Sequence, residues 1–190
     1  SRVNEVHNPP YTLIGTGLKI GVWDEGAVDD RHQDFGDRVT LIEPGESINH
    51  ATHVSGTIAG SGLGDSSARG MAPEALIYSA DFYGDVPQEM ADAAETHGLV
   101  VANNSWGRVV TSDNNYLYGL YESESREFDA VVRQTGLLLV KSAGNDRDDQ
   151  DSTLFNGEYY DCIPTWGNAK NVITVGAVED DGTMSAFSSW

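Results

Sequence analysis

The sequence contains a single cysteine and no long hydrophobic run. One cysteine, Cys162, excludes an internal disulfide framework and a cysteine-rich zinc site. No apolar run approaches the roughly 18 residues that a membrane-spanning helix needs, and residues 1–10 lack the basic and apolar zones of a signal peptide. We therefore expect a soluble segment with no membrane partner, from which any export signal has already been removed.

Basic residues are also scarce, because 11 Lys and Arg stand against 30 Asp and Glu, for a formal net charge of −19. A polyanion repels nucleic acid phosphates and anionic bilayers, so we expect neither as a partner. The 190 residues with 39% hydrophobic side chains are enough to bury a core. No low-complexity linker divides them, and we expect a single domain over residues 1–190.

Apolar runs rich in β-branched residues alternate with stretches of helix formers, which is typical of βαβ units. Near-continuous apolar runs indicate strands that are covered on both faces. The sequence therefore predicts an α/β fold with a mainly parallel sheet and helices on both faces. The expected strands are 18–23, 39–42, 75–80, 98–102, 137–141 and 171–175, and the expected helices are 86–96 and 123–134.

Two polar residues follow predicted strands at the edge where parallel α/β sheets gather their functional groups. Asp24 ends the run LKIGVW, and Asn145 follows the run LLLVKSAG. Taken singly, each is more simply interpreted as a turn residue, since Asp and Asn are common in turns. The functional alternatives are a buried carboxylate for Asp24 and, for Asn145, an amide that donates to developing negative charge.

The segment Asn49–Gly60, NHATHVSGTIAG, places His50 and His53 before a series of small residues. Small residues at helical spacing allow a helix to lie tightly against a sheet. A zinc site is disfavoured, because the Glu of the HExxH pattern is missing and the two histidines are one residue too close. Purely structural histidines are the remaining alternative to a catalytic one.

Taken together, the Asp, the later His-x-Thr-His and the Gly-Asn resemble the subtilisin-like serine proteases, which have the chain order Asp then His. Four further segments resemble family motifs in the same order and extend the resemblance to Trp190. In chain order they are Gly70–Pro73 (GMAP), Asn103–Gly107 (NNSWG), Asn171–Val178 (NVITVGAV) and Ser185–Trp190 (SAFSSW). The Asn-Ser-Trp-Gly form is nearest the alkaline protease branch.

The resemblance implies a subtilisin-like three-layer fold, incomplete at its C-terminus, and a serine endopeptidase that acts on polypeptides. It implies that His53 is the general base, that Asp24 orients it, and that Asn145 is the oxyanion donor. On this alignment His50 is structural. Ser105, Trp106 and Gly107 would hold the peptide through main-chain hydrogen bonds.

The sequence departs from the family pattern at several points. Glu25 follows the Asp where Ser or Thr is usual, Ala51 replaces a Gly, and Arg108 stands where many members have a second Gly. The Gly-Thr-Ser-Met-Ala segment that carries the nucleophile does not occur. We therefore expect a complementary C-terminal segment to supply the serine; the alternative is a non-catalytic peptide-binding module with a protease-like fold.

The acidic residues Asp146, Asp148, Asp149 and Asp151 form the densest charge cluster. A solvated acidic loop is the favoured interpretation, and a structural calcium site is the alternative, since closely spaced carboxylates suit that ion. No cofactor is expected for the chemistry. The family resemblance implies secretion.

Overall fold

The structure, a computed structural model, describes residues 3–109, 111, 113–147 and 162–190. The chain forms two compact units, Ser1–Asn103 and Asn104–Trp190. We refer to them as unit 1 and unit 2.

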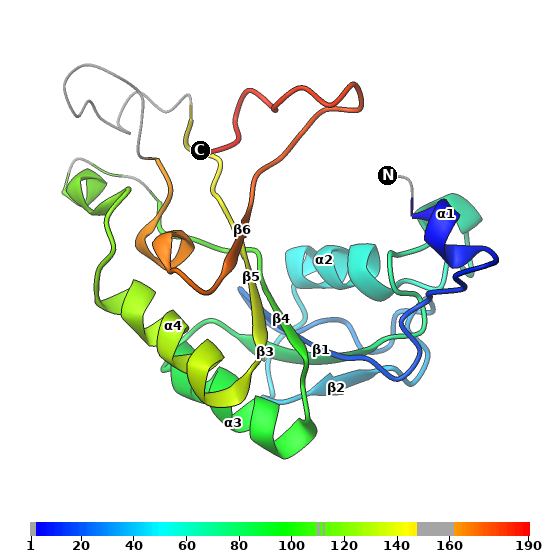
Figure 1. The fold of residues 1–190 in the computed structure, drawn as a ribbon. Helices are drawn as coiled ribbons and strands as arrows, with labels where there is room; N and C mark the ends of the chain where they lie inside the picture. The colour runs from blue at the N-terminus through cyan, green and yellow to red at the C-terminus, as the bar shows by residue number, and fades with distance from the viewer. Residues whose placement is uncertain (1–2, 110, 112, 148–161) are drawn as a thin grey trace. The chain divides into compact units, whose positions relative to one another are not determined.

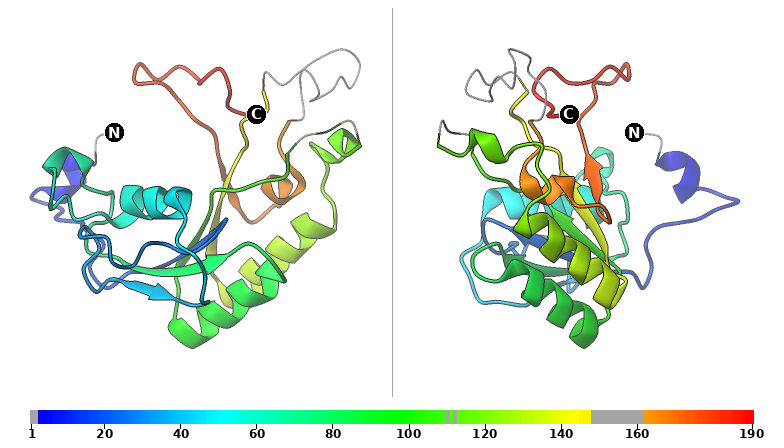
Figure 2. Two further views of the ribbon diagram at one scale, coloured as in Figure 1. Left: turned by 180° about the vertical axis from the view of Figure 1, so that it is seen from behind. Right: turned by 60° about the vertical axis from the view of Figure 1, so that its left-hand side comes forward.

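Unit 1 is a parallel sheet with helices on its two faces. Its elements in chain order are α1 (Asn4–His7), β1 (Lys19–Asp24), β2 (Val39–Leu41), α2 (Asn49–Ala59), the 3-10 turn η1 (Ser66–Ala68), β3 (Leu76–Asp81), α3 (Val86–His97) and β4 (Val101–Asn104), whose last residue is the first of unit 2. The strands follow the order β2-β3-β1-β4, and β1 pairs with β3 from Lys19↔Leu76 to Asp24↔Asp81. Helix α2 covers one face of this sheet and α3 the other (Figures 1 and 2).

The core of unit 1 lies between the sheet and α2. Its largest buried members include Val22, Phe35 and Ile77. On α2 the buried residues are Ala51, Ser55 and Ala59, which recur every four residues and so form one stripe along the helix. Small side chains on this stripe let the helix backbone approach the sheet closely, as the sequence predicted.

Unit 2 places one helix against a short parallel sheet. It contains η2 (Asn115–Leu117), α4 (Ser123–Thr135), β5 (Leu138–Ser142), η3 (Thr165–Asn168) and β6 (Ile173–Val175). Strands β5 and β6 are parallel, with Val140 opposite Ile173. Helix α4 packs against β5 and η3 (Figure 1).

The predicted α/β fold class is confirmed, and every predicted strand and helix is present. Glycines in the left-handed conformation end α3 at Gly98 and α4 at Gly136, with φ of 70° and 74°. Two strands begin more than one residue later than the sequence suggested: β4 at Val101, by three residues, and β6 at Ile173, by two. The single-domain assignment stays a prediction.

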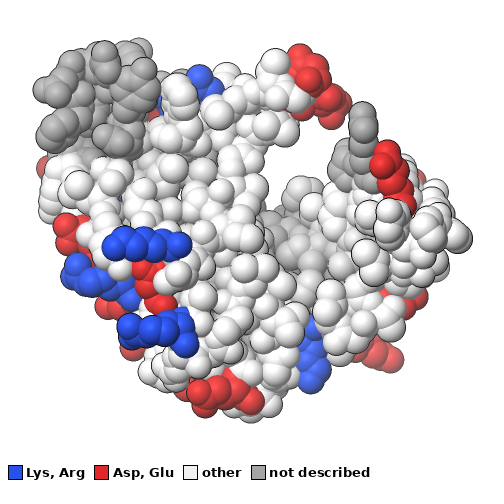
Figure 3. All heavy atoms as spheres, viewed as in Figure 1, with Lys and Arg blue, Asp and Glu red and all other residues white. Residues whose placement is uncertain are grey.

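Among the described residues, no helix is long and apolar enough to cross a membrane. On the face drawn in Figure 3, acidic side chains occur at several separate places, and basic ones gather mainly on the side where α4 lies.

Candidate active site

Asp24 is the last residue of β1, and its side chain is only 1% exposed. Its Oδ1 accepts a hydrogen bond of 2.8 Å from the backbone N–H of Glu25. Its Oδ2 is buried and has no hydrogen-bond partner among the described residues. Burying a carboxylate costs free energy unless the group is paired. Asp24 is therefore expected to have a further polar partner.

Backbone hydrogen bonds tie the turn after Asp24 to the start of α2. Ala27 N donates to Glu46 O at 3.0 Å, and Ile48 N donates to Ala27 O at 2.8 Å. Gly26 lies in this turn, and a larger residue would not fit there, because a Cβ would lie 2.5 Å from Ile48 Cγ1. These bonds fix where α2 begins relative to β1.

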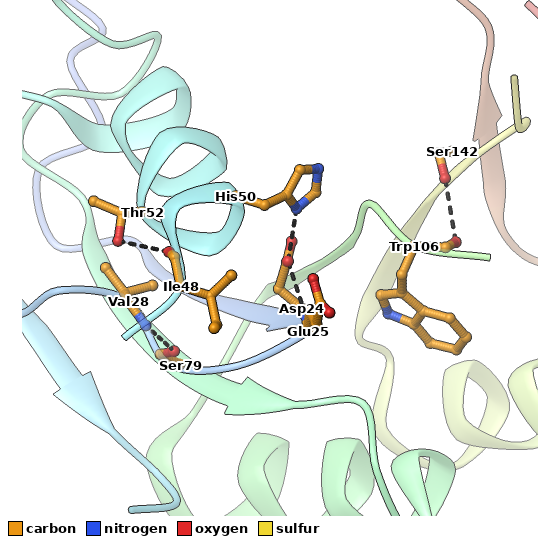
Figure 4. A network of polar contacts seen from close by, with 9 residues as sticks. All are labelled: Asp24, Glu25, Val28, Ile48, His50, Thr52, Ser79, Trp106 and Ser142. Carbon is orange, nitrogen blue, oxygen red and sulfur yellow. Dashed lines mark hydrogen bonds and ion pairs between the residues drawn. The ribbon is translucent and has the colours of Figure 1, made fainter. Parts of the chain in front are cut away.

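A second set of hydrogen bonds secures the same junction (Figure 4). Val28 N donates to Ser79 Oγ at 3.1 Å, and Asp29 N donates to Thr52 Oγ1 at 2.9 Å. The Thr52 hydroxyl in turn donates to Ile48 O at 3.0 Å. The first turn of α2 is therefore held beside the end of β1.

His50, in that first turn, carries the imidazole that meets Asp24. Its Nδ1–H donates to Asp24 Oδ1 over 2.6 Å, and its side chain is 53% exposed. Figure 4 shows the other ring nitrogen on the side away from Asp24. The contact fixes the ring orientation and leaves Nε2 accessible, which is the arrangement that a general base needs.

The predicted pairing of Asp24 with His53 is wrong. Relative to the buried Ala51, His53 is rotated by about 200° around the helix axis, and it therefore projects from the side opposite the sheet. It is exposed and lines a pocket of about 470 Å³ with His32 and Phe35, among other residues. The imidazole that contacts the carboxylate is the one that the sequence interpretation had assigned a structural role.

Two departures from the family pattern fit this site without crowding it. Ala51 is fully buried and packs in the core of unit 1, so its methyl group points into the protein. The Glu25 residue is exposed, and its backbone N–H supports Asp24.

In unit 2, the segment Ser105–Gly107 runs on from the end of β4. The Trp106 ring packs edge-on against Phe128 of α4 and against Trp166 of η3, with centroid distances of 6.4 and 5.1 Å. Arg108 is held in place, since its guanidinium lies 5.1 Å over the Trp166 ring and pairs with Glu124 at 2.7 Å.

Sequence reasoning missed Lys141, which is buried in β5 beneath this segment. Its ammonium group donates to Trp106 O and, at 3.1 Å, to Ser142 Oγ. The Ser142 hydroxyl also donates to Trp106 O, at 3.3 Å (Figure 4). Burial lowers the pKa of Lys141 from 10.5 to about 7. The available signal was a lysine inside an apolar strand.

Asn145 is exposed on the turn that follows β5. The turn is held by Ser189, whose N donates to Gly144 O at 3.0 Å and whose Oγ accepts from Asp146 N at 3.1 Å. Gly144 has a φ of 108°, a backbone conformation that residues with a side chain rarely adopt. Ser189 thus holds the backbone on either side of Asn145.

The calcium prediction falls mostly outside the described residues, which include Asp146 but not Asp148, Asp149 or Asp151. Within the ranges that the structure covers, no group of three or more His, Cys, Asp and Glu could hold a metal ion.

Comparisons with known proteins agree on one family. The family model described as "Subtilase family" (peptidase S8) matches residues 15–190. The chain is 31% identical to subtilisin-like proteinase Mp1 of Magnaporthiopsis poae, over 94% of this chain and 41% of that protein. It is 26% identical to serine protease AprX of Bacillus subtilis strain 168, over 98% of this chain and 44% of that protein.

Among solved structures, the prenylagaramide maturation protease PagA superposes with a TM-score of 0.69 at 22% identity, covering 91% of this chain and 58% of that one. At that identity, the superposition shows the fold alone. The chain spans less than half the length of the two curated relatives described above.

Proposed function

The chain belongs to the subtilase family, and from this premise we propose that it supplies the Asp and His of an Asp-His-Ser triad in a serine endopeptidase. The observation that carries the proposal is the hydrogen bond of 2.6 Å between His50 Nδ1 and the buried Asp24 Oδ1. His50 takes the role that the sequence interpretation gave to His53.

In this mechanism, Asp24 keeps the Nδ1 proton on His50, so Nε2 is free to accept a proton from a serine hydroxyl. The serine oxygen forms a bond to the peptide carbonyl carbon, and the carbonyl π electrons move onto oxygen. The Nε2 proton then passes to the leaving amine as the C–N bond breaks. Water, deprotonated by the same nitrogen, hydrolyses the acyl-enzyme.

Other groups of this chain stabilise the oxyanion and hold the peptide during the attack on its carbonyl carbon. The Asn145 amide donates to the oxyanion, and the main chain of Ser105–Gly107 pairs with the peptide as an added strand. The serine is contributed by a complementary segment that carries the Gly-Thr-Ser motif, on the same polypeptide or on a separate chain. The greater length of the curated relatives supports this part of the proposal. The protein is proposed to be secreted, in line with its family.

The test is casein hydrolysis by the complete protein, with two histidine variants three residues apart. His50→Ala should lower kcat by about 10⁶-fold, the loss seen when the subtilisin histidine is removed. His53→Ala is the matched control, because it removes another histidine from the same helix, on the side opposite the sheet. Its activity should stay close to that of the unsubstituted protein.

Equal losses in the two variants would contradict the assignment to His50. Hydrolysis that is absent from the complete protein, with retained binding of casein, would favour the non-catalytic peptide-binding module instead.

A further inference from the structure

Lys141 is an unusual residue at the centre of unit 2. Its side chain is 0% exposed, and among the described residues no other Lys or Arg is buried. Taking an ammonium ion out of water costs several kcal/mol unless the ion gains strong partners. The partners of Lys141 therefore indicate what it does.

Within the described part of unit 2, the hydrogen-bond partners of Lys141 are oxygens of two short segments. The ammonium group donates to Trp106 O and to Asn104 O, the latter at 3.4 Å, and to the carbonyl and hydroxyl of Ser142 at 3.5 and 3.1 Å. It also lies 5.0 Å from the centre of the Trp106 ring, within the range of a cation–π contact. The lysine thus joins β5 to the segment that continues into Ser105–Gly107.

Within the described part of unit 2, two of the three carboxylates of the neighbouring helix have other partners, and the third, Glu127, is exposed. On α4, Glu124 pairs with Arg108, and Asp129 accepts from the Tyr121 hydroxyl at 2.8 Å. The other charged residues of α4 are Arg126, Glu127 and Arg133, whereas its buried residues are Ser125, Phe128 and Val131. The remaining elements packed on β5, which are η3 and β6, carry no ionisable side chain. The charge of Lys141 is therefore compensated by carbonyl and hydroxyl dipoles.

We propose that Lys141 is a positioning residue, whose ammonium group holds the main chain of Trp106 so that Ser105–Gly107 keeps the conformation that pairs with a peptide. This inference rests on the proposed function, in which Ser105–Gly107 binds the substrate. Lys141 itself touches no substrate, because its side chain is fully buried.

The same geometry makes peptide binding depend on pH. Burial lowers the pKa of Lys141 to about 7, so the charged form dominates below that pH and the neutral amine above it. A charged donor forms a hydrogen bond about twice as strong as a neutral one. Peptide affinity should therefore fall as the pH rises through 7, by about fivefold, which corresponds to about 1 kcal/mol.

The experiment measures binding of unfolded fluorescein-labelled casein by anisotropy, from about pH 6 to about pH 9, on either side of the lysine's pKa. The parent is the complete protein with His50→Ala, which prevents turnover. Lys141→Met keeps an unbranched side chain of nearly the same length and removes its charge; Lys141→Arg keeps a charge at every pH tested. Lys170→Met is the control, because Lys170 is an exposed lysine of the same unit.

The expected result is an affinity that falls about fivefold with pH in the parent and in Lys170→Met. Lys141→Met should bind weakly at every pH, and Lys141→Arg should bind without pH dependence. Equal affinity of the parent and Lys141→Met at every pH would overturn the inference, as would a parent that does not bind casein. If Lys141→Arg does not fold, the comparison of Lys141→Met with Lys170→Met decides alone.

Two further outcomes distinguish failure of the proposed function from failure of the positioning role. With His50 intact, absence of hydrolysis alongside binding that depends on Lys141 would reject the protease and leave the positioning role. Normal hydrolysis with an unchanged KM in Lys141→Met would reject the positioning role and leave the protease.

Discussion

Replacing Lys141 with Met should change how the stability of the protein depends on pH. In the folded protein, the pKa of Lys141 is lowered from 10.5 to about 7 by burial. Between these two values the unfolded chain binds a proton that the folded chain does not, so this group makes the free energy of unfolding rise with pH over that window. Each tenfold change in proton affinity is worth about 1.4 kcal/mol, which sets a ceiling of about 5 kcal/mol on the effect.

The assay is urea unfolding followed by tryptophan fluorescence, carried out at several pH values with the inactive His50→Ala protein as the parent. Lys141→Met leaves carbonyl oxygens without a donor, a cost that does not vary with pH, so the informative quantity is the difference between the two proteins. The free energy of unfolding of Lys141→Met minus that of the parent should be highest at pH 7 and below. This difference should fall steadily toward pH 10.5. A difference that stays constant from pH 7 to pH 10 would refute the reasoning.

Four further predictions concern the active site and its scaffold. Asp24→Asn should leave the fold intact and lower kcat/KM on casein by about 10⁴-fold, because an amide favours the wrong imidazole tautomer; a loss below about tenfold would contradict it. Asn145→Ala should lower kcat by about 10²- to 10³-fold with little change in KM, and a change confined to KM would argue against an oxyanion role. Gly26→Ala should destabilise the protein by about 1–3 kcal/mol, because its Cβ would lie 2.5 Å from Ile48 Cγ1. Gly56→Ala, whose Cβ meets nothing within 4 Å, should stabilise it by about 1 kcal/mol in the same urea titration.

The fold was largely predictable because its signals are local. The apolar runs mark the strands: Lys19–Asp24 is buried on both faces, whereas Leu138–Ser142 buries alternate residues. Gly98 and Gly136 end helices at the positions where a left-handed residue is needed. Each of these features is decided by neighbours in the sequence.

The choice between His50 and His53 was not settled by chain order, since both follow Asp24 in one short motif. The rotation of α2 decides it, and the stripe of Ala51, Ser55 and Ala59 that faces the sheet carries that information. A reading of this stripe would have placed His53 on the outer side. The contact of Lys141 with Trp106 joins residues 35 positions apart and depends on tertiary structure, so no local pattern could reveal it.

Reaction of the complete protein with a fluorophosphonate probe, followed by mass spectrometry of the labelled peptide, tests most directly whether Asp24 and His50 activate a serine. The account predicts one labelled serine in a Gly-Thr-Ser segment outside residues 1–190, with labelling abolished by His50→Ala and kept in His53→Ala. Labelling that survives His50→Ala, or a labelled serine within residues 1–190, would contradict it.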